Sequence, residues 1–163
     1  MNLKITVNGE KKQFDIEPNE MLIDVLRREG YKSVKKGCNM ADCGTCTVLK
    51  DGKAVLSCKV FAASVEGCEI TTVEALGQNG PLHDIQQVFV DESAFQCGFC
   101  APGIIMNTME FMDDIQQREN KVVPVSEIKN RLNGNLCRCT GYEAQLSALK
   151  KLVVKYGGEV EDE

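Results

Sequence analysis

The spacing of the cysteines constrains the fold of this chain more than any other feature. Among its 163 residues are nine cysteines: four in an N-terminal group, four in a C-terminal group, and Cys68 alone. The first group reads Cys38-x4-Cys43-x2-Cys46-x11-Cys58, and the second joins Cys97-x2-Cys100 to a distant Cys137-x-Cys139. Thiolates are soft ligands that suit zinc and iron–sulfur clusters. We therefore expect a fold that brings thiols together at two places.

The first group has the spacing of a plant-type 2Fe–2S site. A loop around such a cluster turns tightly and aims backbone N–H groups at sulfur, and Gly37 and Gly44 permit that conformation because they lack a Cβ. Hydrogen bonds of this kind stabilise the negative cluster and tune its potential. Zinc is the alternative, since a C-x2-C pair also fits that metal.

The second group is unusual for its C-x-C half. A single intervening residue, Arg138, returns the side chain to the same side of an extended chain, and a tight turn does the same in a loop. The sulfurs of Cys137 and Cys139 can therefore reach one cluster. With Cys97 and Cys100 they can complete the tetrahedra of both irons in a second 2Fe–2S cluster.

Length and charge narrow the class of protein. The chain is long enough for one medium domain or two small ones, and small cores gain stability from bound metal. Its formal net charge of −5 argues against nucleic acid as a partner. Residues Met1 to Val7 show no apolar signal-peptide region, and no run reaches the ~18 apolar residues of a membrane span. We expect a cytoplasmic protein with no membrane partner, whose reduced cysteines bind metal rather than form disulfides.

Residues 1–76 show the pattern of an α+β domain. Leu3 to Val7 alternate as a half-buried strand does, Asn8-Gly9 predicts a hairpin turn, and Lys12 to Ile16 return as a second strand. An amphipathic helix is expected over Glu20 to Glu29. Short strands are expected at Thr47 to Leu49, Ala54 to Leu56 and Glu69 to Val73.

The second part of the chain has a helical pattern. Residues 77–81, which read Gly77-Gln78-Asn79-Gly80-Pro81, are predicted to be a linker. Beyond them the apolar period changes from two to near 3.6, so residues 82–157 are predicted to form four short helices in a small bundle. Residues 158–163 are expected to be an acidic, frayed tail.

The chain shows no sign of a catalytic site of its own. His83 is its only histidine and is expected at the surface or at a helix cap. There is no G-x-G-x-x-G after a strand, no phosphate-binding loop, and no Ser/His/Asp set. We therefore expect the chain to move electrons for chemistry that a cofactor performs elsewhere.

Two runs carry a family resemblance: Gln96 to Cys100 followed by Pro102-Gly103, and Gly134 to Tyr142. Joined to a ferredoxin-type loop, they closely resemble the small iron–sulfur subunit of the molybdenum hydroxylase family, the relatives of xanthine dehydrogenase and aldehyde oxidoreductase. The resemblance extends from residue 3 to about residue 155.

The resemblance implies an N-terminal β-grasp domain and a C-terminal four-helix domain, each with one 2Fe–2S cluster. The implied ligands are Cys38, Cys43, Cys46 and Cys58 for the first cluster, and Cys97, Cys100, Cys137 and Cys139 for the second. It also implies a molybdopterin cofactor, bound by a large partner subunit, against which Gln96 and Cys139 lie. A medium partner subunit that binds FAD is implied as the usual electron acceptor.

The sequence departs from the usual family pattern at a few positions. The first loop reads Ala41-Asp42-Cys43-Gly44-Thr45-Cys46, Ala101 stands where the family usually has Thr, and the usual Ile after Gly141-Tyr142 is replaced, with Gln145-Leu146 nearby. None of these changes removes a ligand. They leave the substrate open among purines, N-heterocycles and aldehydes.

The leading hypothesis is therefore an electron-transfer subunit of a molybdenum hydroxylase. A free-standing two-cluster ferredoxin-like carrier is the first alternative, and a zinc-stapled interaction module is the second. Cys68 is the remaining thiol, expected to be packed or at the surface as a free cysteine.

Overall fold

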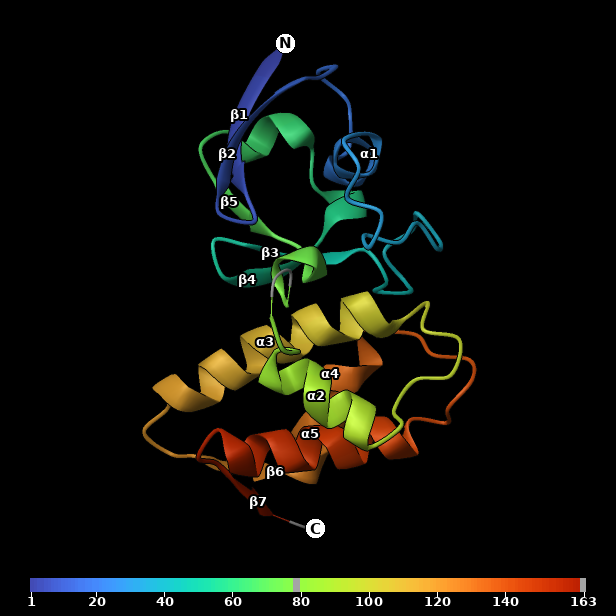
Figure 1. Cartoon of the computed structure of the whole chain (residues 1–163), viewed down its shortest axis with the longest axis vertical. Helices are drawn as coiled ribbons and strands as arrows, with labels where there is room; N and C mark the ends of the chain where they lie inside the picture. The colour runs from blue at the N-terminus through green and yellow to red at the C-terminus, as the bar shows by residue number, and fades with distance from the viewer. Residues whose placement is uncertain (78–79, 162–163) are drawn as a thin grey trace.

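The chain folds into a sheet-containing half and a helical half that lie end to end along the long axis of the molecule (Figure 1). The computed structural model describes residues 1–77 and 80–161. Positions 78 and 79 of the expected linker lie outside the described residues.

The N-terminal half contains a mixed five-stranded sheet in the order β2-β1-β5-β3-β4. Its strands are β1 (Asn2–Val7), β2 (Glu10–Asp15), β3 (Thr47–Lys50), β4 (Lys53–Leu56) and β5 (Glu69–Thr71). The predicted hairpin turn is present, because Asn8 and Gly9 both have positive φ, at 52° and 81°. β5 pairs parallel to β1 and antiparallel to β3, so it joins the two hairpins into one sheet.

The apolar stripe of helix α1 (Leu22–Arg28) packs on this sheet (Figure 1). Leu22, Val25 and Leu26 are fully buried at helical spacing, and Leu3 and Ile5 meet them at strand spacing. Each such side chain contributes roughly 1.5–3 kcal/mol on burial. The helix is shorter than expected, and the chain between β4 and β5 forms short 3-10 turns that the pattern did not indicate.

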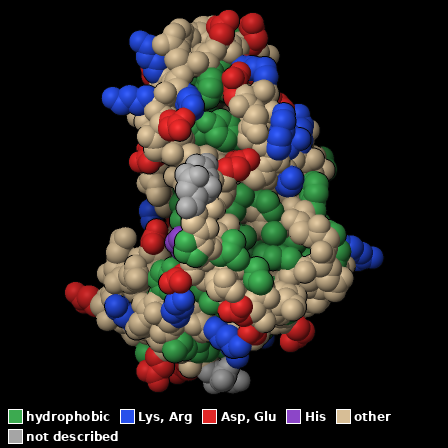
Figure 2. All heavy atoms as spheres, in the orientation of Figure 1, with side chains coloured by type: hydrophobic (Ala, Val, Ile, Leu, Met, Phe, Trp, Pro, Cys, Tyr) green, Lys and Arg blue, Asp and Glu red, His purple; other side chains and the backbone are tan. Residues whose placement is uncertain are grey.

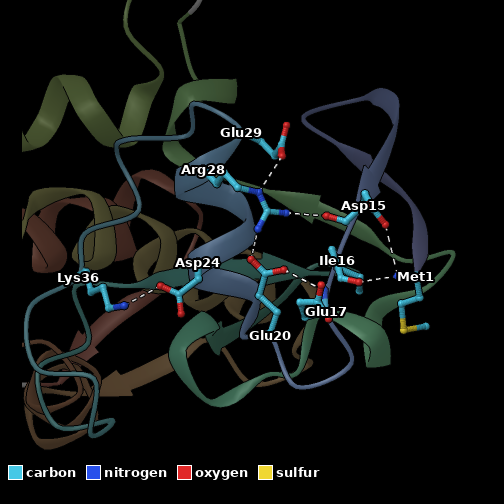
Figure 3. A network of polar contacts seen from close by, with 9 residues as sticks. All are labelled: Met1, Asp15, Ile16, Glu17, Glu20, Asp24, Arg28, Glu29 and Lys36. Carbon is cyan, nitrogen blue, oxygen red and sulfur yellow. Dashed lines mark hydrogen bonds and ion pairs between the residues drawn. The ribbon is translucent and has the colours of Figure 1, made fainter.

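A polar network fixes α1 against the end of the first hairpin (Figure 3). The guanidinium of Arg28 donates to the carbonyl oxygen of Asp15 at 2.8 Å and forms an ion pair with Glu20. The amino group of Met1 donates to the carbonyl of Ile16 at 2.6 Å. Exposed ion pairs contribute only about 0–1 kcal/mol each. The network therefore sets the direction of the helix more than it adds stability.

The C-terminal half is the predicted four-helix bundle. Its helices are α2 (Asp84–Asp91), α3 (Ala101–Gln117), α4 (Val125–Asn133) and α5 (Glu143–Lys155). His83 caps α2: its Nδ1 accepts the N–H of Ile85 at 3.2 Å, while the side chain of Gln86 accepts the N–H of His83 at 3.0 Å. The cap role expected for this histidine is confirmed.

The acidic end of the chain is not frayed throughout. β7 (Glu159–Glu161) pairs in parallel with β6 (Val122–Pro124), and Val123 lies opposite Val160. The expectation of a frayed tail is wrong for these residues, because β7 is held by pairing with β6, which is distant in the sequence. Within residues 1–77 and 80–161, no helix combines the length and apolar character needed to cross a membrane.

The two halves meet where α3 packs against β3 and β4 (Figure 1). The contact is too close for side chains: a Cβ on Gly44 would lie 2.0 Å from the carbonyl oxygen of Gly134, and one on Gly103 would lie 2.4 Å from that of Gly44. The buried amide of Asn135 donates to the Gly44 carbonyl at 2.8 Å. Its own oxygen accepts from Asn107 at 2.9 Å. Asn135 thus links α3, the C-terminal cysteine loop and the N-terminal one.

Replacing Asn135 with Ala tests this link. The change leaves the Asn107 amide without one acceptor and the Gly44 carbonyl without one of its donors, and such losses cost on the order of 1–3 kcal/mol. We expect a decrease of that size in the free energy of unfolding, measured by denaturant titration.

Asn133→Ala is the matched control, because Asn133 is exposed at the end of α4. Its effect should stay within roughly 0.5 kcal/mol. Equal effects of the two substitutions would show that Asn135 does not hold the halves together.

Candidate metal centres

The loop between α1 and β3 carries most of the first cysteine group. It folds tightly: Asn39, Ala41 and Gly44 all have positive φ, at 60°, 69° and 67°. Cys46 directly precedes β3, and Cys58 follows β4 in the 3-10 turn Ser57–Lys59. Because β3 and β4 form a hairpin in which Thr47 pairs with Leu56, its two ends bring Cys46 and Cys58 together.

The thiols of the first group associate in pairs. The side chain of Cys38 interacts with that of Cys43, and the side chain of Cys46 interacts with that of Cys58. Cys43, Cys46 and Cys58 are buried, whereas Cys38 is partly exposed. A 2Fe–2S cluster has four thiolate ligands, two on each iron, so two adjacent pairs match its needs.

The second group is assembled from the loop before α3 and the loop before α5. Cys97 and Cys139 are exposed, and their sulfurs lie 3.6 Å apart. Cys100 and Cys137 are buried, and their side chains interact with each other. This group therefore has an exposed pair and a buried pair, each composed of one cysteine from either loop.

Tyr142 shapes the C-x-C loop. Its hydroxyl accepts the N–H of Cys137 at 2.7 Å, and its own N–H donates to the hydroxyl of Thr140 at 3.2 Å. Tyr142 itself has a positive φ of 67°, directly before α5. This turn lies between the C-x-C pair and α5, and Cys137 and Cys139 both line the cleft that also contains Cys97 and Cys100.

Hydrogen bonds and burial give the thiols different acidities. Backbone N–H groups of Met40 and Cys43 lower the pKa of Cys38 to about 7. Burial raises the pKa of Cys137, but the Thr140 hydroxyl and nearby N–H groups outweigh it and bring the value to about 7. Burial raises the pKa of Cys100 to about 12. Each group thus contains at least one thiol whose surroundings lower its pKa and so favour the thiolate that binds metal.

The two groups face a common cleft of about 350 Å³. It is lined by Cys38 and Cys43 from the first group, by all four cysteines of the second, and by Gly37, Thr45, Phe99, Leu136 and Arg138. Figure 2 shows side chains of the hydrophobic class, which share one colour with cysteine in that view, gathered at the waist of the molecule between the two halves. Among the described residues, no three His, Cys, Asp or Glu side chains converge on a single metal ion; the thiols come together in pairs.

Two further positions were singled out by sequence. Gln96 is exposed, next to Cys97, and makes no hydrogen bond within residues 1–77 and 80–161. Cys68 lies outside both groups, packed against the core of the sheet half. The burial of this thiol raises its pKa.

The structure also reveals polar neighbours of sulfur that the sequence did not indicate. The hydroxyl of Thr45 lies 3.2 Å from the sulfur of Cys43, and that of Thr140 lies 3.2 Å from the sulfur of Cys137. The amide of Gln145 reaches the sulfur of Cys100. Proximity to a cysteine in the sequence was the only available signal, and it does not distinguish a sulfur contact from an exposed side chain.

Both halves match known families. Residues 5–71 match one family, the 2Fe-2S iron-sulfur cluster binding domain. Residues 72–150 match a second family, the 2Fe-2S binding domain. The chain thus carries two domains of the type that binds 2Fe–2S clusters, and their order agrees with the order of the two cysteine groups.

Similar proteins cover nearly the whole chain. The xanthine dehydrogenase iron-sulfur-binding subunit of Escherichia coli O157:H7 is 44% identical over 143 residues, which are 88% of either chain. The nicotinate dehydrogenase small FeS subunit of Eubacterium barkeri is 37% identical over 143 residues, 87% of this chain and 88% of that one. In the crystal structure of quinoline 2-oxidoreductase from Pseudomonas putida 86, a 37% identical chain superposes with a TM-score of 0.86, over 95% of this chain and 94% of that chain.

The fold, the paired cysteines and the relatives that cover most of the chain agree with one another. The α+β arrangement of a ferredoxin-like β-grasp half and a four-helix half is confirmed by these structures. The chain therefore belongs to the family of small iron–sulfur subunits of molybdenum hydroxylases, the relatives of xanthine dehydrogenase and aldehyde oxidoreductase.

Proposed function

We propose that this chain is the electron-transfer subunit of a multi-subunit molybdenum hydroxylase in the cytoplasm. It carries electrons from a molybdopterin centre in a large partner subunit, through two 2Fe–2S clusters, to FAD in a medium partner subunit. Each bound cluster supplies a one-electron redox centre. The proposed ligands are Cys38, Cys43, Cys46 and Cys58 for the first cluster, and Cys97, Cys100, Cys137 and Cys139 for the second.

The exposed edge of the second cysteine group is the observation that carries this proposal. Cys97 and Cys139 are exposed, whereas Cys100 and Cys137 are only 6% and 8% exposed. Phe99 and Leu136 line the same cleft and are 47% and 61% exposed. Apolar side chains exposed side by side mark surfaces that another protein covers. A large subunit docked here would bring its cofactor to the edge of the second cluster.

A direct link between the cysteine groups supports transfer from one to the other. The N–H of Leu136 donates to the carbonyl of Cys43 at 2.9 Å. Cys43 is a proposed ligand of the first cluster, and Leu136 is bonded directly to Cys137, a proposed ligand of the second. One hydrogen bond and a few covalent bonds therefore join the two sites.

The chemistry at the substrate belongs to the partner. The relatives named above serve enzymes called xanthine dehydrogenase, nicotinate dehydrogenase and quinoline 2-oxidoreductase, so one type of small subunit accompanies different substrates. We assign the choice of substrate to the large subunit, and this chain contributes no catalytic residue.

The complex itself is the first test. Purified under its native conditions, the chain should come with two larger chains, one containing molybdenum and one containing FAD, as mass spectrometry and metal analysis would show. A chain that purifies alone with full iron would instead be a free-standing carrier. Substrate oxidation by the isolated, molybdenum-free chain would also contradict the proposal.

Cys58→Ser and Cys68→Ser test the ligand assignment. The unaltered chain should bind about four irons and four sulfides. Cys58→Ser removes one thiolate from the first site, so it should weaken one electron paramagnetic resonance signal and reduce the iron content by up to about half. Cys68→Ser serves as the control and should change neither. The reverse pattern would refute the assignment.

Gln96→Ala tests the contact with the molybdenum subunit. The free amide of Gln96 can donate and accept hydrogen bonds at a pterin edge, and losing an interfacial hydrogen bond costs on the order of 1–3 kcal/mol. We expect unchanged iron content, less molybdenum in the assembled complex, or slower reduction of the clusters by substrate.

Gln87→Ala is the matched control, since Gln87 is an exposed amide on α2 that bonds only to Asp91 in the same helix. If Gln96→Ala leaves both molybdenum content and reduction rate at the Gln87→Ala values, the pterin contact is excluded.

A further inference from the structure

The second cysteine group has a buried amide beside its inner thiols. Gln145 lies in the first turn of α5 and is 0% exposed. Its Nε2 donates to the sulfur of Cys100 at 3.9 Å. Burying an amide costs free energy unless it is hydrogen-bonded, and the sulfur of Cys100 supplies an acceptor for this one.

Thr140 connects the same amide to the other inner thiol. Its hydroxyl lies 3.3 Å from Oε1 of Gln145 and 3.2 Å from the sulfur of Cys137, and it also accepts the N–H of Tyr142 at 3.2 Å. One connected set of polar groups therefore contacts Cys100 and Cys137. In the part of the chain that the structure describes, the exposed thiols of Cys97 and Cys139 form no hydrogen bond with Gln145 or Thr140.

The chemistry of a thiolate fixes which way the amide points. A thiolate can only accept hydrogen bonds, so Nε2 must face Cys100; the flipped amide would place an oxygen lone pair against negative sulfur. Thr140 has a single hydroxyl proton. When Thr140 donates this proton to Oε1 of Gln145, the hydrogen bond holds the amide in this orientation. When Thr140 donates it to the sulfur of Cys137, the hydrogen bond stabilises that thiolate directly.

We propose that Gln145, oriented by Thr140, raises the reduction potential of the second cluster. Adding an electron increases the negative charge on the thiolate ligands, and hydrogen bonds to sulfur stabilise that charge. The effect is strong at this site because the amide is shielded from water, where a donor acts in a low dielectric. Gln145 is thus a positioning residue for electron transfer, and the second cluster accepts electrons more readily because of it.

This inference rests on the ligand assignment proposed above, and two separate measurements distinguish the two. Iron content of the unaltered full-length chain tests the assignment. A redox titration followed by electron paramagnetic resonance tests the role of Gln145, because it reports the midpoint potential of each cluster in the same sample.

Gln145→Met is the test variant, since it keeps the length of the side chain and removes the donor. We expect full iron content, an unchanged midpoint for the first cluster, and a lower midpoint for the second. The expected shift is about tenfold in the one-electron equilibrium constant, which corresponds to about 59 mV. Thr108→Val is the control: Thr108 is a buried polar residue of α3 that none of the cysteine contacts involves, so both midpoints should stay in place.

An unchanged second midpoint in iron-loaded Gln145→Met overturns the proposal, as does an equal shift in Thr108→Val. If Gln145→Met fails to hold iron, Gln145→Leu decides, because it also removes the donor and leaves the Thr140 hydroxyl beside Cys137 in place. A lower second midpoint in iron-loaded Gln145→Leu supports the proposal, and an unchanged one overturns it.

Discussion

The structure depends on the contact between two backbone segments, Cys43-Gly44 and Asn135-Leu136. The N–H of Leu136 and the amide of Asn135 donate to the carbonyls of Cys43 and Gly44, at 2.9 Å and 2.8 Å. The approach is possible only because Gly44 and Gly103 have no side chain in the space between the segments. Each segment carries a cysteine or directly precedes one, so the contact that joins the halves also sets the separation of the two cysteine groups.

This contact explains why the halves differ in the exposure of their thiols. Cys46 and Cys58 are buried at the two ends of the hairpin β3–β4, and the buried Cys43 accepts the N–H of Leu136 from the helical half through its carbonyl. The second group has its inner thiols against the first turns of α3 and α5, while its outer thiols open to solvent. The exposure of the thiols therefore increases from the buried ones of the first group to Cys97 and Cys139 at the surface, as a result of packing.

Much of this could be predicted from the sequence. The Asn8-Gly9 hairpin, the sheet-then-helices order and the cysteine groups follow from local patterns, because turn chemistry, periodicity and ligand spacing are encoded within a few residues. The β6–β7 ribbon and the link through Asn135 could not be predicted. They depend on which residues meet in space, and a buried asparagine reads in the sequence like any loop asparagine. The contact of Gln145 with Cys100 could not be predicted for the same reason, because it depends on how α5 packs beside α3.

The segment from Asn135 to Gln145, which is a loop followed by the first turn of α5, therefore performs separate tasks at successive positions. Asn135 fixes the distance to the first cysteine group, and Cys137 and Cys139 present an inner and an outer thiol. Tyr142 folds the loop by accepting the N–H of Cys137. Because the turn at Tyr142 also starts α5, the position of Gln145 beside Cys100 is tied to the geometry of the C-x-C turn. A change in that turn would move three features together: the hydrogen bond from Asn135 to Gly44, the two thiols, and the buried amide of Gln145. The sequence from Asn135 to Gln145 therefore acts as one structural unit.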